Sequence, residues 1–128
     1  REFIQLSAAS AYAAVGGRIY AHALVQQNFD LPAITVDIQG GTSDPQVPIY
    51  NPVLYVIRVW HKKLESAAAR SIYNLLRDGL HGKTKVTTTT GHIIYCHETQ
   101  AGQDITDFDT ELPSVLSYWR VGMYATAT

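Results

Sequence analysis

The sequence contains a single cysteine, Cys96, among its 128 residues, so no disulfide can form within the chain. Charged residues are also few, at 16% of the chain, and the formal net charge is −1. This balance gives no general electrostatic attraction to nucleic acid or to an anionic membrane. No apolar run approaches the roughly 20 residues that a transmembrane helix needs. The sequence therefore predicts no membrane partner, and a fold that needs no oxidising compartment.

The content of apolar residues, in contrast, is typical of a folded protein. Hydrophobic residues make up 46% of the chain, far more than a disordered segment contains. A chain of 128 residues can bury roughly two-thirds of the surface that it exposes when unfolded. We therefore predict a single domain that spans residues 1–128.

The strongest local pattern is a strand that leads into a helix within residues 53–82. Side chains of Val53–His61 alternate between two faces and are rich in β-branched and aromatic types, which predicts a strand. Gly79 and Gly82 are predicted to close the helix, whereas its start has no clear Ser, Thr, Asp or Asn cap. Three- and four-residue spacings predict one helical stripe, made of Leu64, Ala67, Ala68, Ser71, Ile72, Leu75, Leu76 and Leu80.

The remaining segments predict a mixture of strands and helices. A helix is expected to end at Gly16-Gly17, and the polar stretch 83–90 (KTKVTTTT) is either an edge strand or an extended arm. The order of elements favours an α+β fold, with an antiparallel sheet of about four strands and helices packed on one face. Further strands are predicted at 33–39, 92–98 and 115–125, and loops at 40–48 and 99–113.

Residue patterns typical of catalysis or metal binding are weak. Cys96 and His97 are neighbours on a predicted strand and point to opposite faces, which favours a buried thiol over a nucleophile–base pair. His92 and Cys96 share a face but lie about 13 Å apart along a strand, and no paired Cys/His spacing supplies other zinc ligands. The acidic run 104–111 (DITDFDTE) lacks the glycine of an EF-hand loop, and its final Glu does not stand at the spacing that such a loop requires. We therefore predict no catalytic residue, no metal and no cofactor.

The loops and the polar stretch are the better candidates for function, because long loops within a compact domain are commonly functional. The acidic run 104–111 is either a solvated loop or one side of a protein contact. Candidate residues of a subunit or partner interface are Asp44, Gln46, Tyr50, Lys83, Lys85, Asp104, Asp107, Asp109 and Glu111.

The order of segments resembles the tail-completion (tail terminator, head–tail joining) proteins of long-tailed bacteriophages. The resemblance covers nearly all of the chain and rests on order and spacing, because each motif is short. The Thr-rich stretch 86–90 and the acidic run 104–111 depart from the family's pattern, so its partner surfaces are not carried over. The segments are VGGRIY (Val15–Tyr20), LPAITVDI (Leu31–Ile38), VLYVIRVWHKKLESAAARSIYNLLRDGLHG (Val53–Gly82) and SYWRVGMY (Ser117–Tyr124).

The resemblance implies a virion structural protein of the tail or neck, present in the host cytoplasm during assembly. Such proteins form a homo-oligomeric ring, typically a hexamer, at the head-proximal end of the tail tube. The ring contacts the tail tube protein, stops tube polymerisation and presents a surface to the head connector or stopper protein. DNA passes through the lumen without sequence-specific binding, and the resemblance implies no enzymatic activity.

Three alternatives remain open on the sequence. The first is another phage neck component, such as a head-completion or stopper protein. The second is a small cytosolic enzyme whose site uses Cys96, the histidines and the acidic run. The third is an α+β ligand-binding or toxin–antitoxin module, for which a two-fold dimer is expected in place of a ring.

Overall fold

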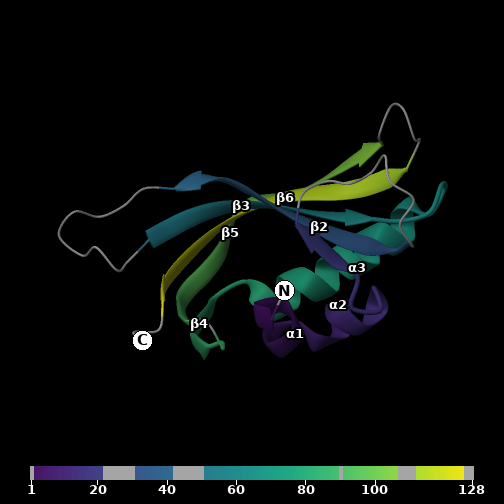
Figure 1. Cartoon of the computed structure of the whole chain (residues 1–128). Coiled ribbons are helices and arrows are strands. Elements are labelled where there is room, and N and C mark those ends of the chain that lie inside the picture. The colour runs from purple at the N-terminus through teal and green to yellow at the C-terminus, as the bar shows by residue number, and fades with distance from the viewer. Residues whose placement is uncertain (1, 22–30, 42–50, 90, 107–111, 126–128) are drawn as a thin grey trace.

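The computed structural model describes residues 2–21, 31–41, 51–89, 91–106 and 112–125. Within these ranges six strands form one sheet in the order β1-β2-β3-β6-β5-β4, and three helices lie against it (Figure 1). The strands are β1 (Ile19–Ala21), β2 (Ala33–Gly41), β3 (Asn51–Trp60), β4 (Lys83–Thr87), β5 (Gly91–Thr106) and β6 (Pro113–Ala125). The helices are α1 (Glu2–Ser7), α2 (Ala9–Ala14) and α3 (Ser66–Leu80).

The predicted fold class is wrong in its strand number, its sheet type and its balance of elements. The described chain is mostly β, and its six strands form a mixed sheet that curls into a half-barrel. The sheet is mixed because β1 runs parallel to β2, whereas the other neighbouring strands are antiparallel. The prediction of about four strands fell short because β1 is short and β4 is polar, so neither carries a strong apolar alternation.

The predicted loop at 99–113 is wrong over most of its length, because β5 continues to Thr106. Polar residues of this half of β5 still pair with β6, and the last pair joins Thr106 to Pro113. Irregular register of this kind bends a strand and strengthens its twist, which fits the curled sheet. The register shifts between Ile93 and Tyr95, between Glu98 and Gln100, and between Gln100 and Gln103.

The three helices lie on one side of the curled sheet, with α3 against its inner face and α1 and α2 beside α3 (Figure 1). The predicted lack of a capping side chain is confirmed, since no side chain caps α3 at Glu65. The predicted stripe is displaced around the helix: Leu75 is 41% exposed, and Leu64 precedes the helix and is 92% exposed. The side chains of α3 that are buried are Ala69, Ile72, Tyr73, Leu76 and Leu80.

A close backbone approach joins α3 to the start of the chain. Gly79 lies inside α3, contrary to its predicted role in closing the helix, and a Cβ there would lie 2.5 Å from the Cβ of Ala8. Gly82 follows the end of α3 with a φ of +81°, a conformation that favours glycine. The α1–α2 junction therefore packs directly on the end of α3.

One hydrophobic core lies between the helices and the sheet. Its largest fully buried member is Trp119, whose indole N–H donates to the Ser117 hydroxyl at 2.8 Å. That hydroxyl donates in turn to the carbonyl oxygen of Ile57 on β3, at 3.1 Å. These two hydrogen bonds satisfy the buried side-chain donors of Trp119 and Ser117 within the core. No helix in the described ranges is long and apolar enough to cross a bilayer.

Candidate assembly surfaces

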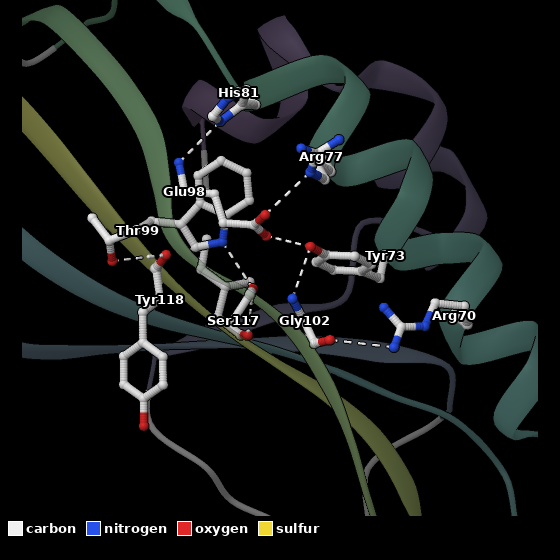
Figure 2. A network of polar contacts seen from close by, with 11 residues as sticks. Arg70, Tyr73, Arg77, His81, Glu98, Thr99, Gly102, Ser117 and Tyr118 are labelled. Carbon is white, nitrogen blue, oxygen red and sulfur yellow. Dashed lines mark hydrogen bonds and ion pairs between the residues drawn. The ribbon is translucent and has the colours of Figure 1, made fainter.

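A cluster of polar side chains fastens α3 to β5 (Figure 2). The Glu98 carboxylate accepts a hydrogen bond from the Arg77 guanidinium at 3.1 Å and another from the Tyr73 hydroxyl. The backbone N–H of Glu98 donates to Nδ1 of His81 at 3.1 Å, which requires that nitrogen to be unprotonated. The Glu98 side chain is only 4% exposed. The groups that hydrogen-bond to Glu98 here belong to α3 and to His81, the residue that follows α3.

The same helix also holds β5 further along, at Gly102. The Gly102 N–H donates to the Tyr73 hydroxyl at 2.9 Å, and its carbonyl oxygen accepts from Arg70 at 3.2 Å. Arg70 also forms an ion pair with Asp104 at 3.1 Å. A Cβ on Gly102 would lie 2.7 Å from Tyr73 Cζ, so a glycine is what lets β5 approach the helix this closely. We call Arg70, Tyr73, Arg77, Glu98 and Gly102 the α3–β5 clasp.

The clasp fixes β5 against α3, because its polar groups form hydrogen bonds with one another. Burial raises the pKa of the Tyr73 hydroxyl, and its hydrogen bond to Glu98 adds to the rise. The hydroxyl therefore stays a neutral donor at ordinary pH. The three α3 side chains Arg70, Tyr73 and Arg77 are three and four residues apart, the spacing of one helical face. That spacing was visible in the sequence, but its partners on β5 were not.

Cys96 and the adjacent His97 do not form a reactive pair. Cys96 is 1% exposed in the core, and burial raises the pKa of its thiol to about 12. His97 is exposed and stacks on Tyr95, with ring centroids 5.4 Å apart, so the predicted separation of Cys96 and His97 is confirmed. Within the part of the chain that is described, no three His, Cys, Asp or Glu side chains gather where they could hold a metal ion.

The outer face of the sheet carries no helix in the described structure (Figure 1). Since Ile57 and Val59 of β3 belong to the core, strand alternation places their neighbours on this outer face. Arg58 lies there over the Trp60 ring at 4.4 Å and donates to the Ser114 hydroxyl at 3.3 Å. The face is half apolar, with partly buried Leu54, Val56, Tyr95, Leu116 and Tyr118.

The polar stretch at 83–90 begins with an edge strand, which confirms one of its two predicted alternatives. Among the described strands β4 pairs with β5 alone, and Lys83 and Lys85 on it are exposed. Lys85 has a φ of +57° and is skipped in the register between Thr84 and Val86. Lysines and a local irregularity are features that discourage an edge strand from pairing with another sheet. This edge therefore suits contacts through side chains.

The structure describes three of the nine candidate interface residues. Lys83 and Lys85 lie on β4, and Asp104 lies near the end of β5 with a side chain 62% exposed. Lys83 pairs with Cys96, eight residues before Asp104, so the basic and acidic candidates are about 25 Å apart along the strand. The others lie outside the described residues: Asp44, Gln46, Tyr50, Asp107, Asp109 and Glu111.

Comparison with known proteins gives a match in fold. No protein-family model matches the sequence, and no curated protein matches it. A solved structure titled "Virion of native gene transfer agent (GTA) particle" contains a chain of similar fold, with a TM-score of 0.62. The match covers 94% of each chain at 15% sequence identity. The protein therefore shares its fold with a component of a virion.

Proposed function

We propose that the protein is a structural subunit of a phage-type virion and acts by assembly, without catalysis. The observation that carries this proposal is the match in fold to a virion component over 94% of both chains. The resemblance of the segment order to tail-completion proteins points the same way. It draws on different information, since the matched virion chain shares only 15% of its residues with this one.

Within the virion, we assign the protein to a ring at the head-proximal end of the tail tube. There it ends tube polymerisation and joins the tail to the head connector or stopper, while DNA passes through its lumen. The family resemblance supports this finer assignment, and it implies a ring of six copies. The assignment places the protein in the tail or neck of the particle.

The charge distribution offers a way for copies to join in a ring. A closed ring needs two different patches on each subunit. Lys83 and Lys85 on β4 supply a basic patch, and Asp104 with the acidic run that follows it supplies an acidic one. Lys83 and Asp104 lie about 25 Å apart along β5, so these two candidates do not pair with each other within one chain. In the ring, the basic patch of one copy faces the acidic patch of the next.

The α3–β5 clasp gives this arrangement a fixed geometry. It holds the far half of β5, where the pairing with β6 is irregular, against the most deeply packed helix. That half of β5 leads directly into the acidic run. A patch presented from a fixed strand loses less conformational freedom when a neighbouring copy binds.

Tails that assemble without heads provide the test. Electron microscopy with an antibody against the protein is expected to label one end of each headless tail. Tails assembled without the protein are expected to be longer than normal, because nothing stops the tube. Labelling of tailless heads, with no label on tails, would contradict the terminator role and favour a head-completion or stopper protein.

A further inference from the structure

The far half of β5 sorts its side chains by charge between the two faces of the sheet. The carboxylates of Glu98 and Asp104 point toward α3, where Arg77 and Arg70 pair with them. Other polar side chains of this half pair in register with outer-face residues of β6, and cross-strand partners point to the same side. Figure 2 shows the Tyr118 ring on the side of the sheet away from α3. The pairs are His97 with Arg120, Gln100 with Tyr118, and Gln103 with Leu116.

Register shifts in β5 produce this arrangement. They lie between Glu98 and Gln100 and between Gln100 and Gln103, so the pairing with β6 skips the residues in between. The outer positions here are therefore three residues apart, at His97, Gln100 and Gln103. All three side chains are exposed, and so is that of Arg120. We call these four residues the donor row, because each can donate a side-chain N–H.

The donor row is accessible to a partner. Within the described residues, no hydrogen bond or ion pair engages the Arg120 guanidinium. His97 stacks on Tyr95 through its ring face, which orients the imidazole and keeps the ring nitrogens accessible. Tyr95 in turn lies against Gly122 on β6, where a Cβ would collide with its ring. The sheet itself therefore positions the row.

The outer face around the row carries little negative charge. Three carboxylates lie on the described strands, and Asp37 is the one among them that belongs to the outer face, like its register partner Val56. β3 separates Asp37 from β6, which places it about 10 Å from that strand across the sheet. The net charge of −1 for the whole chain therefore does not describe this face.

The chemistry of the row fits the phosphate backbone of a nucleic acid. Phosphate oxygens accept hydrogen bonds from arginine, glutamine and tyrosine side chains, and such contacts carry no sequence information. From His97 to Gln103 the row measures at most about 20 Å along β5, and the phosphates of one DNA strand follow at about 3.4 Å of helix axis. The row can therefore reach several phosphates of one duplex.

We propose that the donor row contacts the phosphate backbone of the DNA that passes through the ring. This inference rests on the proposed function, which supplies the ring and the DNA. It adds the face of the sheet that lines the lumen and the side chains that touch the DNA. The row lies on β5 between Cys96, which pairs with Lys83, and Asp104, so neither proposed contact with a neighbouring copy covers it. One arginine in each copy gives a weak contact, which lets the DNA slide.

The double variant His97→Gln/Arg120→Gln tests the contact in the purified full-length protein. We expect its Kd for a labelled DNA duplex at low salt, measured by fluorescence anisotropy, to rise about tenfold. The rise should be the same for two duplexes of unrelated sequence, because phosphates carry no sequence information. Lys62→Gln removes the same charge at an exposed position before α3 and should leave Kd within about twofold of wild type. Both variants should melt at the wild-type temperature, because the changed side chains are exposed.

A wild-type protein that does not bind the duplex overturns the proposal. So does an unchanged Kd in the double variant, or an equal rise in the Lys62→Gln control. In particles that are releasing DNA, a photo-reactive amino acid in place of Gln100 is expected to cross-link to DNA. A cross-link to a protein, or none, overturns the DNA contact and leaves the proposed function standing. Absence of the protein from the particles overturns the proposed function as well.

Discussion

Arg77 on α3 and Glu98 on β5 form an ion pair at 3.1 Å, although 48% of the arginine side chain is exposed and only 4% of the glutamate. The pair is therefore asymmetric. Water solvates the cation, whereas the carboxylate depends on its protein partners. Removal of the arginine leaves a buried charge with fewer hydrogen bonds, which is more costly than the loss of a surface pair.

Arg77→Ala should lower the free energy of unfolding by about 1–2 kcal/mol, more than for an exposed pair and less than for a fully buried one. Urea unfolding of the purified protein measures the change. Asn74→Ala changes an exposed residue on the same helix and should shift the value by no more than about 0.5 kcal/mol. Equal effects of the two substitutions would show that the clasp does not hold β5.

Gly79→Ala should destabilise the protein by about 1–3 kcal/mol, because the new methyl group overpacks a close contact. The added Cβ would lie 2.5 Å from the Cβ of Ala8 and 2.6 Å from the carbonyl oxygen of Ser7. In a helix without such a contact, a change from glycine to alanine raises stability. The sign of the change in stability therefore shows whether the contact exists. Thermal unfolding is the measurement, and a raised midpoint would show that α1 does not pack on α3 in this way.

Cys96 should resist a thiol-specific reagent at pH 8 in the folded protein and react when the chain is unfolded in urea. Burial raises the pKa of its thiol from 9.0 to about 12, so the folded form keeps the proton that the unfolded form loses above pH 9. The contribution of this thiol to the free energy of unfolding is therefore fully present below pH 9, and it decreases as the pH rises from 9 toward 12. Rapid labelling of the folded protein would contradict the buried position.

Charge reversal on β4 tests the contact between copies. Lys83→Glu/Lys85→Glu should leave the fold intact, because both side chains are exposed, and should weaken the ring. Opposite changes in the acidic patch, Asp104→Lys with Asp107→Lys, should restore it in a mixture of the two variants. The fraction of rings is counted by mass photometry at low salt, where screening is weak. Rings that form equally well from Lys83→Glu/Lys85→Glu alone would exclude this pairing.

Local patterns in the sequence were sufficient for the strongest elements. Alternation along Val53–His61 predicted a strand, and the structure places β3 there, with Ile57 and Val59 in the core and Arg58 on the other face. The change of period after it predicted a helix, which is α3. These elements bury one face each, so their side-chain pattern records their conformation directly.

The remaining features depend on contacts that a sequence pattern does not record. The far half of β5 is polar and looks like a loop, yet it is a strand because its backbone pairs with β6 and α3 holds it. The left-handed conformation of Leu64 was missed for a related reason, since its apolar side chain fits the helical spacing that follows. The strand in the far half of β5 depends on partners that are distant in sequence, and the conformation of Leu64 is a property of the backbone.

The interface roles of the acidic run 104–111 and of the loop at 40–48 were predicted from composition alone, and they stay predictions. Among the candidates in the described ranges, Lys83 and Lys85 are exposed, while Asp104 already pairs with Arg70. Composition identified where charge collects. It could not identify which charges are engaged within the chain, because the partner on α3 is distant in sequence.

The mass and shape of the purified full-length protein in solution test the central claim most directly. Electron microscopy with mass photometry, with and without tail tubes, should show a closed ring of several copies, six being expected, that sits on tube ends. A protein that remains monomeric at high concentration, and remains so beside tail tubes, would contradict the account.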